Sequence, residues 1–162
     1  MKKLVVLSLM AFALNAHAQT WDLTQEQPRY SDATGYGYDF TASPTKKSTS
    51  PFYFSVKVPD GNYKVTVTIG SKKKAAETVV RAESRRLFVE STPTKKGQFK
   101  TYSFIVNKRS PYINEKMNVR IKDREKGSLN WDDRLTLEFN GPCPAVKEIK
   151  IEPDNTATTI FL

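Results

Sequence analysis

The stretch from residue 51 to 70, PFYFSVKVPDGNYKVTVTIG, constrains the fold most, because apolar residues occupy every second position in two successive runs. These positions are Phe52, Phe54, Val56 and Val58 in the first run, and Tyr63, Val65, Val67 and Ile69 in the second. A period of two with aromatic and β-branched residues is typical of half-buried antiparallel strands. Between the runs, Pro59-Asp60-Gly61-Asn62 has the chemistry of a turn. The stretch therefore predicts a β-hairpin.

Further alternating segments extend this pattern along the chain. The positions expected to face a core are Val80 and Ala82, Leu87 and Val89, Tyr102, Phe104 and Val106, Val119 and Ile121, Leu135, Leu137 and Phe139, and Ile149 and Ile151. Turn residues separate these short segments, and no stretch has a helical period. Such a pattern is typical of β-sandwiches and jelly rolls. We therefore predict an all-β fold, an antiparallel β-sandwich or jelly roll.

The N-terminus has the pattern of a secretory signal peptide over residues 1–18. Lys2 and Lys3 precede an apolar run from Leu4 to Leu14, and Ala16-His17-Ala18 is a small-residue cleavage site. No later apolar run is long enough for a membrane span. We therefore expect export to the periplasm or the medium after cleavage near Ala18, and a single sandwich domain over residues 19–153.

Two rare residue types exclude several kinds of active site. The one histidine of the chain, His17, lies in the predicted signal peptide. A Ser-His-Asp or Cys-His mechanism within the mature chain is thereby excluded, as is a histidine-ligated metal. Cys143 is the one cysteine, so no intramolecular disulfide can form. The core must therefore hold the fold without such a link.

The charge of the chain is basic, with 26 lysines and arginines against 17 acidic residues and a formal net charge of +9. For an exported protein this charge favours acidic polysaccharide or an anionic cell surface as partner, and not nucleic acid. Lys72–Lys74 with Arg81, Arg85 and Arg86 would suit the carboxylates of galacturonate. The alternative, which we favour from the sequence, is that these cations only solvate exposed faces.

Four segments carry a resemblance to a known family: FYFSVKVPDGNYKVTVTIGS, AETVVRAESRRLFVE, FKTYSFIVNKRSPYI and LNWDDRLTLEFNGPCPAVKEIKIEP. Tyr-Ser-x-x-x-Gly-Tyr-Gly at 30–37 fits the same pattern. From Phe52 to Leu162 the chain resembles the N-terminal β-sandwich region of bacterial rhamnogalacturonan acetylesterase-like enzymes, which are SGNH or GDSL hydrolases of pectin breakdown. The resemblance implies a galactose-binding-like module.

In that family a catalytic domain follows the sandwich and opens with a strand running into a Gly-Asp-Ser motif. Thr159–Leu162 resembles this opening strand, so residues 154–162 are expected to be a linker and the first strand of an SGNH hydrolase domain. The chain ends before the family's catalytic residues. The resemblance therefore implies a truncated, non-catalytic accessory module, with a C-terminal hydrolase domain and pectic polysaccharide as its partners.

Two clusters are candidates for carbohydrate binding. Trp131 could stack on a sugar ring while Asp132 and Arg134 bond hydroxyls or a uronate, and Tyr36 and Tyr38 could line a groove. Each cluster has a structural alternative: Trp131 as a cap on the edge of the core, and the tyrosines as core or turn residues. No catalytic residue and no metal ligand is predicted. A structural Ca²⁺ ion has only weak support, because no EF-hand spacing is present.

Two functional alternatives remain beside the carbohydrate-binding module. The chain could be a purely structural sandwich that supports an esterase domain. It could also be a small polysaccharide lyase whose base is Tyr, Lys or Arg, since such a base needs no histidine.

Overall fold

The computed structural model describes residues 17–40, 51–126 and 129–158. The strands formed by these residues are β1 (Gln19–Asp22), β2 (Tyr36–Asp39), β3 (Phe52–Lys57), β4 (Gly61–Gly70), β5 (Ala76–Ala82), β6 (Arg86–Thr94), β7 (Phe99–Lys108), β8 (Tyr112–Asn114), β9 (Met117–Asn118), β10 (Arg134–Cys143) and β11 (Val146–Pro153). A single short 3-10 helix, η1 (Asp123–Glu125), is present in the same described ranges. Most of the predicted signal peptide, and the strand expected over 159–162, lie outside the described residues.

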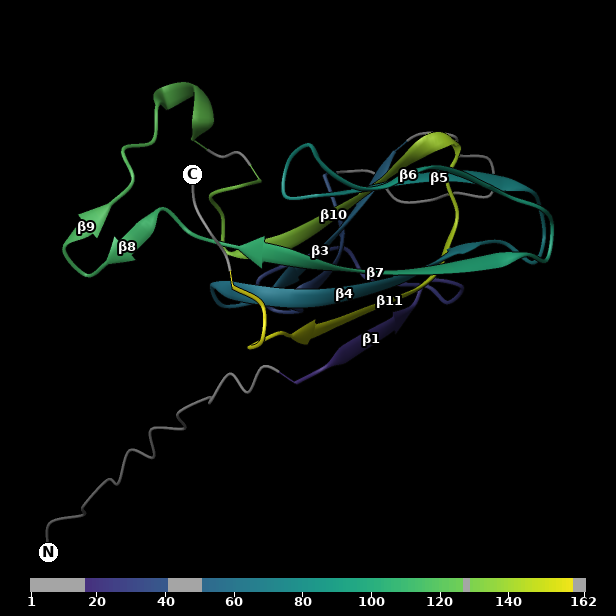
Figure 1. The fold of residues 1–162 in the computed structure, drawn as a ribbon, viewed down its shortest axis with the longest axis horizontal. Coiled ribbons are helices and arrows are strands. Elements are labelled where there is room, and N and C mark those ends of the chain that lie inside the picture. Colours follow the sequence, from purple (N-terminus) through teal and green to yellow (C-terminus); the bar gives the residue numbers. More distant parts are fainter. Residues whose placement is uncertain (1–16, 41–50, 127–128, 159–162) are drawn as a thin grey trace, which may run out of the picture.

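Two antiparallel sheets pack face to face (Figure 1). One sheet has four strands in the order β1-β11-β4-β7, and the other has five in the order β2-β3-β10-β5-β6. Every neighbouring pair within these two sheets is antiparallel. The predicted all-β, antiparallel β-sandwich is therefore confirmed.

Both strands predicted over 51–70 form, as β3 and β4, but the predicted hairpin between them is wrong. β3 pairs with β2 and β10, whereas β4 pairs with β7 and β11. The turn therefore carries the chain from one sheet to the other. Each strand has one apolar face, and two such faces can cover each other when the strands lie in opposite layers. Asp60 holds this corner, because it accepts hydrogen bonds from Lys108 Nζ at 2.7 Å and Ser110 Oγ at 2.6 Å.

The core between the sheets is built from the alternating apolar positions. Fully buried side chains include Phe54, Val65, Val67, Ile69, Val80, Val106, Leu135, Leu137, Phe139 and Ile149. The inward faces predicted for β10 and β11 are thus confirmed. Leu87 is a wrong prediction, since it is 52% exposed while Val89 is buried. The register between β5 and β6 shifts twice, on either side of the pair Val80 and Val89, and this irregularity breaks the alternation of β6.

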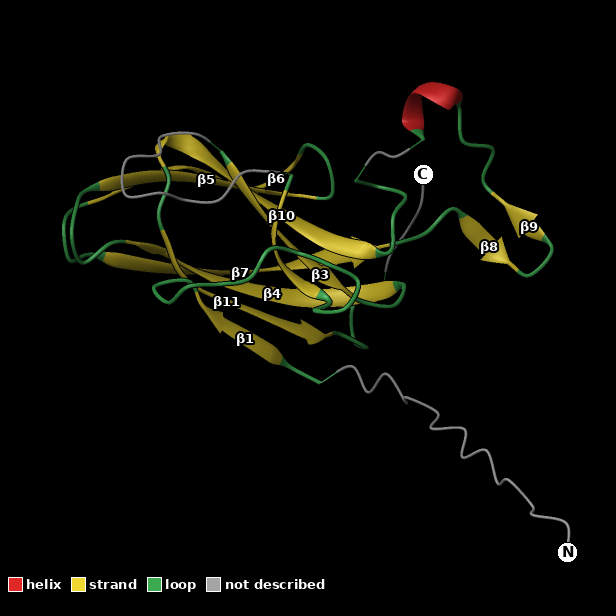
Figure 2. Ribbon diagram, turned by 180° about the vertical axis from the view of Figure 1, so that it is seen from behind, coloured by secondary structure: helices red, strands yellow, loops and turns green. Residues whose placement is uncertain are grey.

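A two-stranded ribbon, β8 and β9, projects from one end of the sandwich (Figures 1 and 2). The strand predicted around Val119 and Ile121 is wrong, because β9 ends at Asn118 and Val119 is 40% exposed. Instead, the amide of Val119 donates to the carbonyl of Pro111 at 2.7 Å and closes the base of the ribbon.

At the turn between β5 and β6, Glu83, Ser84 and Arg85 have φ values of 48°, 56° and 72°. Such left-handed conformations are costly for residues other than glycine. The turn places the Glu83 side chain inside the protein, where 1% of the residue is exposed. Its Oε1 accepts a hydrogen bond from the amide of Thr136 at 2.9 Å, and its Oε2 lies 3.7 Å from Arg86 Nη2. Burial raises the pKa of Glu83 to about 7.

Replacing Gly70 by alanine is expected to destabilise the sandwich. Gly70 ends β4 with φ of 119°, and a Cβ there would overlap the carbonyl oxygen of Gln98. Left-handed strain and overpacking together should lower the free energy of unfolding by at least about 2 kcal/mol. Urea unfolding followed by tryptophan fluorescence would measure this loss.

Gly97→Ala is the matched control for Gly70→Ala. Gly97 also has a positive φ, of 80°, but a Cβ there would meet nothing within 4 Å. It should cost only about 1 kcal/mol, from backbone strain alone. Equal losses in the two variants would contradict the packing argument.

Candidate functional site

Arg134, one of the predicted ligand-binding residues, is engaged by the protein itself at the start of β10. Its Nη1 lies 3.0 Å from Asp39 Oδ2, and its Nε lies 3.4 Å from Asp132 Oδ2 and 3.7 Å from Asp133 Oδ1. Its guanidinium also covers the ring of Tyr30, 4.7 Å from the centroid. Three carboxylates and one ring therefore already take the contacts that a uronate would need.

The pKa values of the two acidic residues beside Arg134, Asp132 and Asp133, are shifted in opposite directions. Burial raises the pKa of Asp132, although the amide of Arg134 donates to its Oδ1 at 3.0 Å. A hydrogen bond from Lys57, whose Nζ lies 3.0 Å from Asp133 Oδ2, lowers the pKa of Asp133. The cluster joins the ends of β2, β3 and β10, so its chemistry is that of a structural ion network.

The two predicted tyrosines do not form a groove. Tyr38 is 8% exposed, and its ring contacts Phe52 and Phe54 at centroid distances of 6.0 and 5.8 Å. Burial raises the pKa of Tyr38 to about 12. Tyr36 is half-buried and packs on Trp21 at 5.6 Å. The structure therefore does not support Tyr38 as a carbohydrate-binding residue, because the core encloses its ring.

Trp131 lies in the same region but has little free ring surface. It is half-buried, and the guanidinium of Arg109 lies over its ring at 5.2 Å from the centroid. A ring that stacks on a cation cannot offer that face to a sugar. The predicted cluster of Trp131, Asp132 and Arg134 thus resembles a closed corner of the fold more than an open site.

We expect Arg134→Met to lower the free energy of unfolding by about 2 kcal/mol, because it leaves partly buried carboxylates without their cation. Affinity for any acidic glycan should not change. Urea unfolding and a titration with the glycan would test the two statements separately. Arg120→Met, which removes an exposed cation, is the control for charge alone. A loss of affinity without a loss of stability would contradict the structural role.

A pocket of about 520 Å³ lies at the opposite end of the strands, where β4 ends and β7 begins. Its lining comes from segments far apart in the sequence: Asp22, Leu23, Thr24, Gln25, Phe52, Gly70, Ser71, Lys72, Lys73, Lys74, Phe99, Pro144, Ala145, Val146 and Lys147. This volume lies in the range that binds small ligands. The pocket is the strongest candidate site in the described part of the chain.

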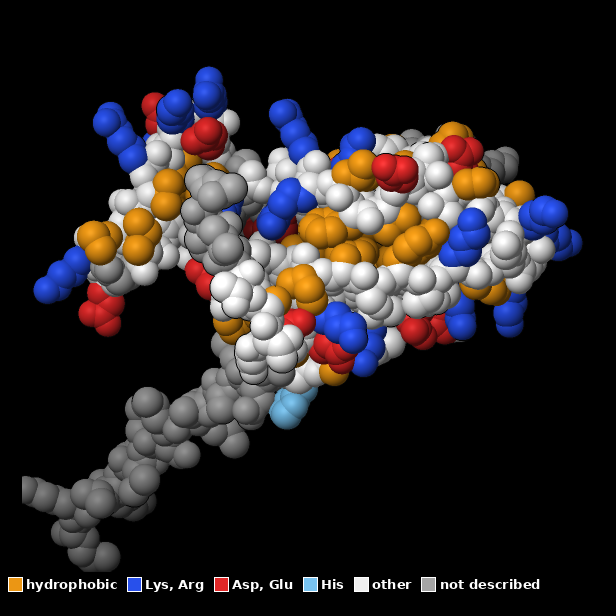
Figure 3. Space-filling model, in the orientation of Figure 1, with side chains coloured by type: hydrophobic (Ala, Val, Ile, Leu, Met, Phe, Trp, Pro, Cys, Tyr) orange, Lys and Arg blue, Asp and Glu red, His pale blue; other side chains and the backbone are white. Residues whose placement is uncertain are grey.

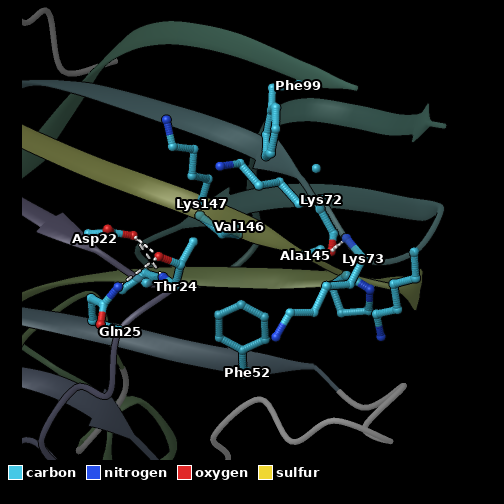
Figure 4. A pocket seen from close by; sticks show the side chains of 15 residues that line it. Asp22, Thr24, Gln25, Phe52, Lys72, Lys73, Phe99, Ala145, Val146 and Lys147 are labelled. Carbon is cyan, nitrogen blue, oxygen red and sulfur yellow. Dashed lines mark hydrogen bonds between the residues drawn. The ribbon is translucent and has the colours of Figure 1, made fainter. Parts of the chain in front are cut away.

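Four lysines give the pocket its charge. Lys72, Lys73 and Lys74 come from the loop between β4 and β5, and Lys147 comes from β11. In Figure 4, Lys73 reaches toward Phe52, while Lys72 extends toward the side of Phe99 and Lys147. Across residues 17–40, 51–126 and 129–158, none of the four forms a salt bridge. Their ammonium groups are therefore available to an anionic ligand.

Backbone and side-chain hydrogen bonds hold the lysine loop in place. The amide of Gly97 donates to the carbonyl of Ser71 at 2.8 Å, and Ser71 Oγ accepts from the amide of Lys73 at 3.1 Å. On the other wall, the hydroxyl of buried Thr78 accepts from the amide of Ala145 at 3.0 Å. The lysine loop is thus anchored to the turn between β6 and β7.

Aromatic and polar groups complete the lining. The Nζ of Lys147 lies 5.6 Å from the centroid of Phe99, and Phe52 is buried at the base. Asp22 Oδ1 accepts from the hydroxyl and the amide of Thr24 at 2.6 and 2.9 Å, and these hydrogen bonds lower its pKa. Asp22 is therefore ionised at neutral pH and can accept a hydrogen bond from a ligand hydroxyl. The four lysines still give the pocket a net positive charge.

The structure separates the basic residues that we grouped from the sequence. Lys72–Lys74 line the pocket, whereas Arg81 lies 3.5 Å from Glu138 and Arg86 lies 3.7 Å from Glu83. The sequence favours a solvated face for the lysines and gives no signal for Lys147 or Phe99. The signal that could have found the pocket is the three-lysine turn itself, since it directly follows a buried strand.

Neither a metal site nor a membrane-spanning helix is found in the described ranges. No group of three or more His, Cys, Asp and Glu side chains comes together there, so the weak expectation of a Ca²⁺ ion gains no support. No helix in these ranges is long and apolar enough to cross a membrane.

No model of a known protein family matches the chain, and no curated protein matches it. Among solved structures, it is similar to the GH26-CBM35 β-(1,4)-mannanase of Podospora anserina, with 9% sequence identity and a TM-score of 0.44. The similarity covers 88% of this chain but 29% of the mannanase chain. The resemblance to rhamnogalacturonan acetylesterases stays a prediction.

Proposed function

We propose that this chain is a non-catalytic module that binds acidic polysaccharide through the lysine pocket. The observation that carries the proposal is the pocket of about 520 Å³ that Lys72, Lys73, Lys74 and Lys147 line together with Phe99. Lysine ammonium groups form charge-assisted hydrogen bonds with carboxylates. Phe99 gives the pocket an apolar wall, with Lys147 Nζ 5.6 Å from the centroid of its ring. A uronate residue presents a carboxylate to such ammonium groups.

The finer proposal concerns the biological context. We propose that the glycan is pectic, with galacturonate as the repeating acid, and that the module serves a secreted rhamnogalacturonan acetylesterase-like hydrolase. Two arguments support this proposal: the sequence resemblance given above, and the sign of the charge in the pocket. The partly open surroundings of the lysines favour weak binding that salt screens, because exposed ion pairs each contribute at most about 1 kcal/mol.

Affinity electrophoresis tests the proposal directly. Migration should be retarded in gels that contain polygalacturonate, and not in gels that contain a neutral mannan. Retardation should weaken as salt is added, since the contacts are electrostatic. Equal mobility in all gels would overturn the proposed binding. Release of unsaturated products, followed by ultraviolet absorbance, would instead indicate a lyase.

A further inference from the structure

The β8–β9 ribbon exposes large apolar side chains that the sandwich does not cover. Their exposed fractions are 70% for Tyr112, 63% for Ile113, 55% for Met117 and 40% for Val119. A two-stranded ribbon with no core of its own is marginally stable in water. These side chains therefore mark a surface that is suited to contact something else.

We propose that the β8–β9 ribbon binds the surface of an anionic phospholipid bilayer. Tyr112 and Ile113 are consecutive residues of β8, and consecutive side chains of a strand point to opposite faces. The ribbon is therefore apolar on both faces. A folded protein partner would cover one face, whereas the interfacial layer of a bilayer surrounds an inserted ribbon on all sides. Tyrosine is also a preferred residue at the membrane–water interface.

The charges beside the ribbon specify an anionic lipid. Arg120, Lys122 and Arg124 follow β9 and are exposed, and Figure 3 shows basic side chains above the apolar ones at this end of the molecule. Of the nearby acids, Asp123 pairs with Lys126 at 2.6 Å and Glu125 accepts from the amide of Lys122 at 3.2 Å, while Glu115 is exposed in the turn between β8 and β9. Five cations between residues 115 and 126 outnumber these three acids. Basic residues next to an inserting apolar segment bind anionic headgroups. The same positive charge opposes contact with a second copy of this ribbon.

Vesicle sedimentation tests the proposal on the whole chain. Vesicles of phosphatidylcholine that contain phosphatidylglycerol should bind the protein at least about tenfold more tightly than vesicles of phosphatidylcholine alone. Tyr112→Ser with Ile113→Ser should weaken this binding about tenfold or more, because the inserted apolar surface is lost. Alanine at Arg120, Lys122 and Arg124 should weaken binding to the anionic vesicles by about fivefold for each cation replaced.

Leu87→Ser with Ile105→Ser is the matched control, because these exposed apolar residues lie on the sandwich and not on the ribbon. This control, and alanine at Lys72 and Lys73, should leave vesicle binding in place. Three outcomes would overturn the proposal. They are equal binding to both kinds of vesicle, full binding by the ribbon variant, and a dimer in the absence of lipid that Ile113→Ser dissociates. The lysine variants make failure here distinguishable from failure of glycan binding.

Discussion

Glu83→Gln is expected to make the protein more stable at pH 8 than the wild type, by about 3 kcal/mol. The carboxyl of Glu83 is buried, and this burial raises its pKa from 4.5 to about 7. Glutamine has the same shape and carries no charge, so it avoids the cost of ionising a buried group. At pH 4.5 and below, the two proteins should differ little.

The sign follows from the proton count of the two states. Between pH 4.5 and 7 the unfolded chain has lost the Glu83 proton, whereas the folded protein retains it. The folded state therefore binds more protons, and wild-type stability falls as the pH rises through this window. Hydrogen bonds from Lys108 and Lys57 lower the pKa values of Asp60 and Asp133. These two carboxylates lose their contribution to folding stability only in more acidic solution. Their titration does not overlap with that of Glu83.

Urea unfolding at a series of pH values measures this effect. Glu90→Gln is the matched control, because Glu90 is exposed on β6. That control keeps the buried carboxyl of Glu83, so its stability should still fall as the pH rises from 4.5 to 7. Parallel curves for the wild type and Glu83→Gln would show that the buried carboxyl does not titrate in this window.

Replacing Lys72, Lys73 and Lys147 together by alanine is expected to weaken binding of oligogalacturonate about one hundredfold. Each exposed cation contributes up to about 1 kcal/mol to a carboxylate contact. The three side chains come from two elements but line one pocket (Figure 4). Isothermal titration calorimetry at low salt would measure the loss.

Alanine at Arg120, Lys122 and Arg124 removes the same number of charges at the opposite end of the molecule. That variant should keep the wild-type affinity within about twofold, because salt screens distant charges. If both triple variants lost affinity equally, the glycan would respond to net charge and not to the pocket. Thermal unfolding of each variant would confirm that the fold is intact.

Much of the fold was predictable from local pattern, because burial of alternate side chains leaves a period of two in the sequence. Leu135, Leu137 and Phe139 were predicted to face the core, and all three are fully buried. The pattern identifies the buried face of a strand but not its neighbour. For this reason β3 and β4 were expected to pair, although they lie in different sheets. Leu87 was wrongly predicted to face the core, because a shift in strand register leaves no local signal.

The candidate site was less predictable, because it depends on contacts between distant segments. In the sequence, Arg134 has no evident partner and could bind a ligand. The fold brings Asp39 of β2 to it, with Asp39 Oδ2 3.0 Å from Arg134 Nη1. For the lysine pocket the sequence was misleading in the opposite direction, because it gave no sign of a site there. Lys72 looked like an ordinary solvated residue until the fold placed it beside Phe99 and Lys147.

The most direct test of acidic glycan binding compares two ligands of the same length on the wild-type protein. One is oligogalacturonate, and the other is its methyl ester, which keeps the sugar rings but removes the carboxylate charges. Titration calorimetry should show at least tenfold tighter binding of the acid, since the lysines contact the charge. Equal affinity for acid and ester, or binding of neither, would contradict the proposed function.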